Sequence, residues 1–174
     1  AAWAQQIVQA KLHRQARVLA RWRQDRPDAR LALTRAERGV ATVREALAVL
    51  HADSGDTFAR LATLRGLEGT AARAHFAGLA AVLPPALGFT GRNRRPPRDP
   101  ANACLSLGYT LLHAEAVTAA QAAGLDPLLG FYHRPAFGRE SLACDLIEPL
   151  RPAVDEWIWQ QFSPGPLRPE HFSP

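Results

Sequence analysis

Apolar residues recur every three or four positions through most of this chain, and this helical period constrains its fold more than any other feature. In residues 1–24 the period runs through Val8, Leu12, Ala16 and Leu19. No alternation of apolar and polar residues is long enough to indicate a β-strand. The sequence therefore predicts an all-α fold. Its 174 residues, 47% of them apolar, suffice for a single domain with one core.

Prolines and loop residues divide the chain into helical segments. The predicted helices are residues 1–24, 31–50, 58–83, 102–122 and 141–162. We expect Asn102 to cap the fourth helix, and Pro149 and Pro152 to disturb the last one. The chain contains no methionine, and it starts within a helical pattern, so we expect residues 1–174 to be one domain of a longer protein.

The basic residues are almost all arginines. Lysine and arginine total 21 against 16 acidic residues, giving a net charge of +5, and Lys11 is the only lysine. Arginine pairs bidentately with phosphate, which favours a nucleic-acid partner. A GC-rich coding sequence would also produce such a composition, and that alternative stays open. Lys11, Arg14, Arg17 and Arg21 form a stripe on the first helix, either a solvated face or a track for phosphates.

The most charged loop of the chain is the segment 91–100. Its arginines are Arg92, Arg94, Arg95 and Arg98, and two prolines between them stiffen the segment. Such a sequence cannot lie in a core. We interpret it as a loop that contacts DNA phosphates, with a flexible basic linker as the alternative.

Acidic residues and a histidine near the C-terminal end predict a metal site. If residues 141–148 form a helical turn, Asp145 and Glu148 share one face, with His133 on the preceding loop. One further carboxylate would complete a catalytic divalent-metal site with open positions for water and substrate. Glu68 is the candidate for this fourth group, because it lies in an alanine-rich helix with few other charges.

Two glycines flank Glu68 within the third predicted helix. Each of Gly66 and Gly69 costs about 1 kcal/mol of helix stability relative to alanine. We expect them to allow the close approach of a metal ion or a DNA backbone, or alternatively close packing of a second helix.

Other familiar chemistries lack their motifs in this sequence. There is no His-Glu-x-x-His, Cys-x-x-Cys, Walker or dinucleotide-binding pattern. Cys104 and Cys144 indicate no disulfide, and His75 and His113 are interpreted as structural or surface residues. No apolar run approaches the roughly 20 residues of a membrane span and no signal peptide is visible, so we expect a cytoplasmic protein without membrane contact.

Four motifs, in this order and spacing, closely resemble the CRISPR-associated protein one family, the integrase of CRISPR adaptation in prokaryotes. The resemblance covers nearly the whole chain, from a Lys11-x-x-x-Gln15 segment onwards. The motifs are Glu68-Gly-x-Ala-Ala-Arg73; Arg94-Arg95-Pro-Pro-x-Asp99-Pro100-x-Asn102 with Gly108-Tyr109; Gly124-Leu-Asp126-Pro127-x-x-Gly130-Phe131-x-His133; and Ser141-Leu-Ala-x-Asp145-Leu-x-Glu148-x-x-Arg151-Pro152.

The resemblance implies a helical C-terminal catalytic domain and a reaction. In this family a 3′-hydroxyl of a short DNA duplex attacks a phosphodiester at the CRISPR repeat, in a metal-dependent transesterification. Glu68, His133 and Glu148 are then the metal ligands, and Asp145 either binds metal or orients the site. The carboxylates suit magnesium, and the imidazole makes manganese a good substitute.

The resemblance also implies partners. Double-stranded DNA, as prespacer and as repeat, would be held by phosphate contacts from Arg73, Arg94, Arg95 and Arg98. A CRISPR-associated protein two subunit and a homodimer are expected, although the family's β domain, which organises that dimer, is absent from these 174 residues. Pro149 departs from the family pattern. The C-terminal sequence also resembles members fused to, or associated with, a reverse transcriptase.

Two other functions stay open at this point. One is a helical nucleic-acid-binding or assembly module without activity, in which Glu68, His133 and Glu148 would not converge within metal-ligand distance. The other is a metal-dependent nuclease that uses water as its nucleophile. The nuclease shares every ligand with the integrase, so the sequence does not separate them.

Overall fold

The computed structural model describes residues 2–50, 56–93, 95–134, 136–163 and 165–172, and every regular element within them is helical. The predicted all-α fold is confirmed. The α-helices are α1 (Ala2–Asp25), α2 (Arg30–Ala48), α3 (Thr57–Val82), α4 (Pro100–Ala122), α5 (Ser141–Ile147) and α6 (Arg151–Phe162). Short 3-10 turns are η1 (Pro27–Ala29), η2 (Pro85–Leu87), η3 (Glu148–Leu150) and η4 (Pro169–His171). None of the described helices is long and apolar enough to cross a membrane.

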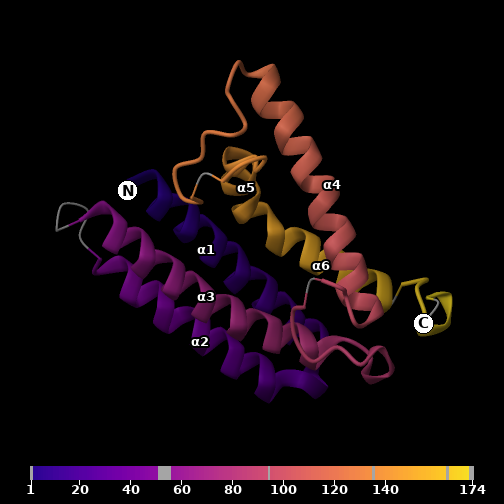
Figure 1. Cartoon of the computed structure of the whole chain (residues 1–174). Coiled ribbons are helices and arrows are strands. Elements are labelled where there is room, and N and C mark those ends of the chain that lie inside the picture. The colour runs from indigo at the N-terminus through magenta and orange to yellow at the C-terminus, as the bar shows by residue number, and fades with distance from the viewer. Residues whose placement is uncertain (1, 51–55, 94, 135, 164, 173–174) are drawn as a thin grey trace.

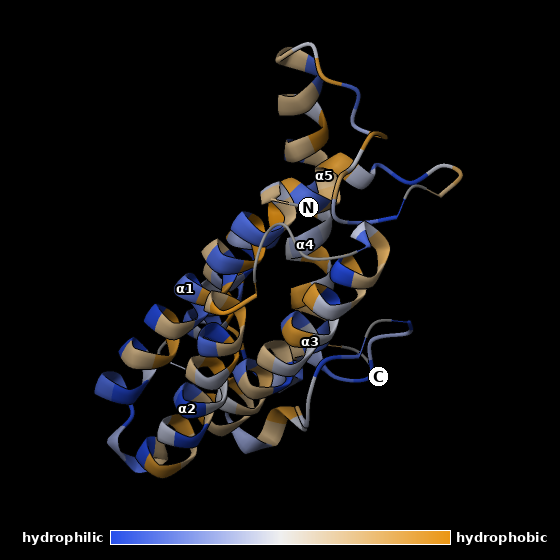
Figure 2. Cartoon of the chain, turned by 90° about the vertical axis from the view of Figure 1, so that its left-hand side faces the viewer, coloured by the Kyte–Doolittle hydropathy of each residue, from blue (hydrophilic) through white to orange (hydrophobic). Residues whose placement is uncertain are grey.

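Helix α1 is the central element of the fold. It contacts α2 and α3 on one side and η3 and α6 on the other, while α4 packs on α5 and α6 (Figure 1). A side chain on α1 can therefore reach both the three-helix layer and the C-terminal helices. Figure 2 shows hydrophilic residues along the outer faces of α1 and α2.

The core forms where the apolar stripes of these helices meet. Leu12, Leu19 and Trp22 of α1 are fully buried, and each such side chain contributes about 1.5–3 kcal/mol through burial. Gly78 lets α3 approach α1 closely, because a Cβ at this position would lie 2.4 Å from Leu19 Cδ2. Gly78 therefore allows the close packing of α3 against α1.

Helix α4 begins two residues before the predicted start. Its N-cap is Asp99, whose carboxylate accepts a hydrogen bond from the Asn102 backbone N–H at 2.8 Å, and Pro100 occupies the first turn, where no N–H is needed. The prediction of Asn102 as the cap was wrong. Its buried side chain instead accepts from the Asn93 N–H at 3.0 Å and donates to the Gly91 carbonyl at 2.9 Å. Asn102 therefore anchors the arginine loop to α4.

The predicted disturbance by two prolines is confirmed. Helix α5 ends at Ile147, η3 contains Pro149, and α6 starts at Arg151 with Pro152 in its first turn. Since proline lacks an N–H, the α-helical hydrogen-bond ladder cannot run through this point. The resulting turn packs against α1 and carries Glu148 to it.

Candidate active site

Lys11 lies at the centre of the site. Its Nζ donates to Glu148 Oε2 at 2.6 Å and to Glu68 Oε1, and the side chain is 8% exposed. The predicted exposed stripe is therefore wrong at this position. Because α1 is the central helix, the face that carries Lys11 is covered by α3 and η3. Lys11 joins the two predicted carboxylate ligands and is unavailable to a DNA phosphate in this arrangement.

The charges of this cluster stabilise one another. Burial lowers the pKa of Lys11, but the carboxylates of Glu148 and Glu68 outweigh this effect, and the pKa is raised. Burial likewise raises the pKa of Glu148, yet Lys11 and Arg151 outweigh it, and that pKa is lowered. Lys11 and Glu148 are both charged at neutral pH.

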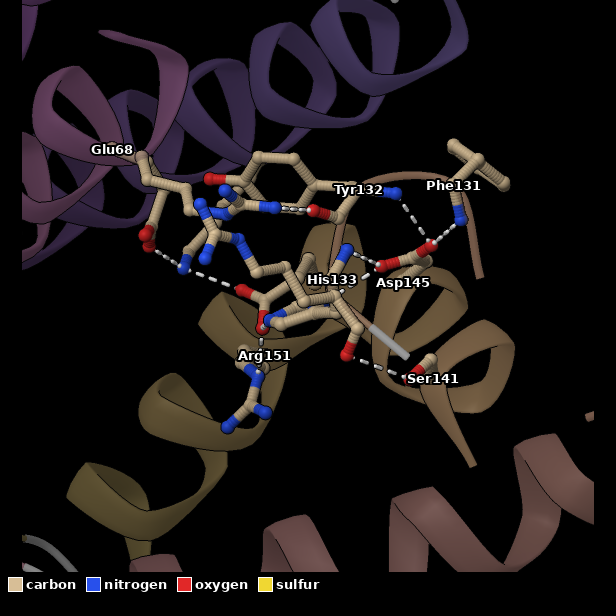
Figure 3. Close-up of polar contacts among 11 residues, drawn as sticks. Glu68, Phe131, Tyr132, His133, Ser141, Asp145 and Arg151 are labelled. Carbon is tan, nitrogen blue, oxygen red and sulfur yellow. Dashed lines mark hydrogen bonds and ion pairs between the residues drawn. The ribbon is translucent and has the colours of Figure 1, made fainter. Parts of the chain in front are cut away.

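A loop wraps around the carboxylate of Asp145. The backbone N–H groups of Phe131, Tyr132 and His133 donate to it at 2.7, 2.9 and 2.9 Å, and His133 Nδ1 lies 2.7 Å from Oδ1 (Figure 3). Burial raises the pKa of Asp145, but the hydrogen bonds from His133 and from the backbone outweigh this, and the pKa is lowered. Because its oxygens are engaged by these donors, Asp145 orients the imidazole.

Gly130 allows the loop to approach α5. A Cβ on Gly130 would lie 2.7 Å from the backbone carbon of Ser141, closer than any side chain tolerates. The chain before it is fixed to α5 as well, since the Leu142 N–H donates to the Pro127 carbonyl at 2.9 Å. Gly130 thus allows the loop to bring His133 within hydrogen-bond distance of Asp145.

The three predicted ligands line one cavity of about 130 Å³, together with Lys11. With Nδ1 facing Asp145, Nε2 is the free nitrogen of His133, and it lies 4.0 Å from Glu148 Oε1. Glu68 reaches the same cavity from the middle of α3. The non-catalytic alternative predicted that these three side chains would not converge within metal-ligand distance. They line one cavity, but among the described residues no three such side chains are arranged to hold a metal, so this alternative stays open.

The side chains of the site are of the types that bind a divalent ion. Their present positions do not form a metal-binding arrangement. Two carboxylates and an imidazole suit magnesium or manganese. The buried hydroxyl of Tyr132 has no hydrogen-bond partner among the described residues, which leaves a polar group available beside these acids. In the part of the chain that the structure describes, no three acidic, histidine or cysteine side chains are arranged to hold a metal. The Lys11 ammonium lies between Glu68 and Glu148.

Sequence reasoning missed two arginines at the site. Arg151 Nε forms an ion pair with Glu148 Oε1 at 2.9 Å, and its guanidinium lies 4.6 Å from the centre of the Tyr109 ring. Arg65 donates to the Tyr132 carbonyl and lies over the ring of the same residue at 5.6 Å. The three-residue spacing of Arg151 from Glu148 could have indicated the first, but nothing in the sequence pairs Arg65 with the loop.

A second histidine and carboxylate pair lies deeper in the molecule. His75 Nε2 is 2.9 Å from Asp155 Oδ2, and the Tyr109 hydroxyl donates to Asp155 Oδ1. Burial, followed by the charge of Asp155, raises the pKa of Tyr109. His75 is completely buried against Trp22, with ring centres 5.4 Å apart. This histidine is structural.

The remaining predicted DNA contacts are on the surface. Arg14, Arg73, Arg95 and Arg98 are exposed, whereas Arg94 lies outside the described residues. Arg73 donates to Thr70 Oγ1 at 3.0 Å. These positions permit contact with phosphates.

The glycines beside Glu68 do not serve helix packing. A Cβ on Gly66 or on Gly69 would meet no atom within 4 Å. Of the two predicted purposes, close approach of a second helix is wrong. The surface beside Glu68 is open, and its accessibility to a ligand stays a prediction.

The fold and the site define a class of protein: an all-α domain with a carboxylate and histidine centre beside exposed arginines, suited to work on phosphodiesters. The chain belongs to the Cas1 family, since the family model "CRISPR associated protein Cas1" matches residues 1–174.

Curated relatives agree with this family. The chain is 51% identical over 100 residues to a CRISPR-associated endonuclease Cas1 of Thermodesulfovibrio yellowstonii, covering 58% of this chain and 31% of the relative. It is 41% identical over 160 residues to a CRISPR-associated exonuclease Cas4/endonuclease Cas1 fusion of Rhodospirillum rubrum, covering 88% and 26%. The chain thus spans less than a third of the length of either relative.

Solved structures share the fold. A Cas6-RT-Cas1–Cas2 complex matches with a TM-score of 0.80 and 29% identity, over 96% of this chain and 17% of the matched chain. A casposase bound to integration product matches with a TM-score of 0.76 and 26% identity, over 99% and 45%.

Proposed function

We propose that this chain is the catalytic domain of a CRISPR adaptation integrase, which joins the 3′-hydroxyl of a prespacer DNA to a phosphodiester of the CRISPR repeat. The observation that carries the proposal is the convergence of Glu68, His133 and Glu148 on one cavity. Membership of the Cas1 family and similarity to a casposase bound to integration product support it.

Glu68, His133 and Glu148 would hold a magnesium or manganese ion. When bound, such an ion supplies a Lewis acid that neutralises charge on the reacting phosphate and activates the attacking hydroxyl. Asp145 holds Nδ1 of His133 and thereby directs Nε2 toward Glu148.

Basic residues around the cavity would hold DNA. Arg151 balances the charge of Glu148 at the cavity wall. Arg73, Arg95 and Arg98 are exposed and can pair with backbone phosphates, which positions the duplex without reading its sequence. We assign Arg94 and Arg14 the same role.

The partners of this domain follow from its relatives. The similar Cas6-RT-Cas1–Cas2 complex supports a Cas2 subunit and an associated reverse transcriptase for the protein that carries this chain. We also propose a homodimer, so that both ends of one double-stranded DNA are joined. The location of the reaction would be the cytoplasm of a bacterium.

A comparison of two DNA ends tests the proposed nucleophile. A labelled duplex with a 3′-hydroxyl, incubated with repeat DNA and manganese, should give a joined product, whereas the same duplex with a dideoxy end should give none. Glu148→Gln should abolish joining with both magnesium and manganese. Cleavage of the repeat that is equal with both ends would instead support the nuclease that uses water.

A further inference from the structure

Lys11 lies between two of the residues proposed to hold a metal. Its ammonium lies between Glu68 and Glu148, two of the three proposed ligands. We propose that Lys11 is an exchangeable internal cation: it neutralises this acid pair in the metal-free protein and moves to Gln15 when a divalent ion binds. The inference rests on the proposed metal site and adds a mechanism by which that site is kept assembled before loading.

Lys11 and a metal ion cannot share the space between the two acids. Magnesium binds oxygen ligands at about 2.1 Å, so an ion held by both Glu68 and Glu148 would need space that the Lys11 ammonium fills. Both carboxylates are largely withdrawn from water, with side-chain exposures of 21% and 8%. Without a cation between them they would repel each other in a poorly solvated site. In the metal-free protein the Lys11 ammonium, which contacts both carboxylates, offsets this repulsion.

Arg151 is not the group that leaves. It contacts only Glu148 of the two acids, and its guanidinium is held over the Tyr109 ring. It can keep its ion pair while an ion binds on the side of Glu68. Lys11 has a flexible stem of four carbons and a compact charge, which suits it to move.

Gln15 offers the displaced ammonium a place. It lies one turn after Lys11 on the same face of α1, and its side chain lines the same cavity. Its Oε1 atom is buried and has no hydrogen-bond partner within the described part of the chain, and Gln15 is 2% exposed. Movement of the Lys11 ammonium to Gln15 would explain why the buried Oε1 acceptor of Gln15 is otherwise unsatisfied. Asp155 lines this cavity too, but its oxygens already contact His75 and Tyr109.

The first test is manganese affinity in Lys11→Met, measured on the purified protein by the electron paramagnetic resonance signal of free manganese. Methionine keeps the length of the side chain and removes its charge. We expect binding tighter by about tenfold or more, the scale on which groups outside the ligand set change metal affinity. In EDTA the variant should melt at a lower temperature than the wild type, and manganese should raise its melting temperature by more.

Arg35→Met is the matched control. It removes one positive charge from an exposed position on α2, away from the cavity, and should leave manganese affinity unchanged. If Lys11 instead stayed on the acids and held them in place for the metal, Lys11→Met would bind manganese more weakly than the wild type. Affinity equal to or weaker than that of the wild type overturns the exchange.

The second test removes the acceptor. Gln15→Leu should weaken manganese binding when Lys11 is present and should have no effect in the Lys11→Met background, because the two changes act on one movement. An equal effect of Gln15→Leu in both backgrounds would refute the role of Gln15. Should Lys11→Met not fold, Lys11→Gln serves for the same comparison.

Failure of the proposed metal site gives a different result. In that case neither the wild type nor Lys11→Met binds manganese, and Glu148→Gln changes nothing. Manganese binding that is lost in Glu148→Gln but not strengthened by Lys11→Met retains the metal site and rejects the exchange.

Discussion

Two histidine and aspartate pairs in this molecule have similar nitrogen–oxygen distances, use different ring nitrogens and have different surroundings. His133 Nδ1 lies 2.7 Å from Asp145, and His75 Nε2 lies 2.9 Å from Asp155. Both carboxylates are buried. The His133 side chain is 21% exposed and presents its second nitrogen to Glu148, whereas the His75 side chain is 0% exposed and packs against Trp22.

The two pairs differ in the hydrogen-bond donors that contact each aspartate carboxylate. Asp145 accepts three backbone N–H groups in addition to His133, so it is satisfied by the loop and can orient the imidazole. Asp155 depends on two side chains, His75 and Tyr109. The contrast teaches that the pairing itself does not make a histidine functional. The two pairs differ in the second ring nitrogen, which is buried without a partner among the described residues in His75 and lies 4.0 Å from Glu148 Oε1 in His133.

The largest expected effect is that of His133→Ala on activity. Strand transfer should fall by about a thousandfold or more, equivalent to about 4 kcal/mol of transition-state stabilisation. Stability should change by less than about 1 kcal/mol, because Asp145 keeps its backbone hydrogen bonds. A strand-transfer assay with manganese and a thermal melt measure the two effects. Near-normal transfer would remove His133 from the site.

The same change at His75 should act on folding. His75→Ala removes a fully buried ring and leaves Asp155 with Tyr109 alone, which should cost about 3 kcal/mol of unfolding free energy. Urea unfolding of the two alanine variants side by side provides the measurement. Equal stability losses in both variants would contradict the distinction between the pairs.

Asp145→Asn should weaken stability in a manner that depends on pH. The folded pKa of Asp145 is lowered from 3.8, so its carboxylate stabilises the fold fully above about pH 5 and loses this effect as the pH falls through the folded pKa. The variant should therefore be about 2 kcal/mol less stable at neutral pH, and the gap should narrow below about pH 4. Unfolding at pH 7 and at pH 3 tests this, and a constant gap would exclude an ionised Asp145 as the cause.

The smallest expected effects are changes in stability from glycine-to-alanine substitutions, and their sign should differ between the two halves of α3. Gly66→Ala and Gly69→Ala, beside Glu68, should each stabilise the protein by about 0.5–1 kcal/mol, because the space around both is open. Gly78→Ala, in the half that carries His75, should destabilise it by about 1–3 kcal/mol through the contact with Leu19. Thermal melts compare the three. Weaker DNA binding by the first two variants would support close approach of a DNA backbone to this surface.

The helices were largely predictable, because an amphipathic period and proline breaks are local properties. The start of α4 was not, since both Asp99 and Asn102 are good caps and only their distances to neighbouring backbone groups choose between them. Part of the site was also predictable, because the spacing of Asp145 and Glu148 and the glycine before the loop can be read from the sequence. The different contacts of Asp145 and Glu148 were not predictable, because they depend on which donor lies within hydrogen-bond distance of each carboxylate oxygen.

The sequence by itself determined the helical class and the breaks at Pro149 and Pro152, and it supplied the residues that we propose for metal and phosphate binding, since each follows from side-chain type and short spacing. Only the tertiary structure decided that Lys11 turns inward and joins Glu68 to Glu148, 57 and 137 residues away. The physical reason is that α1 is covered on two sides. A charged residue on its interior face must find partners from distant segments, and no local pattern specifies them.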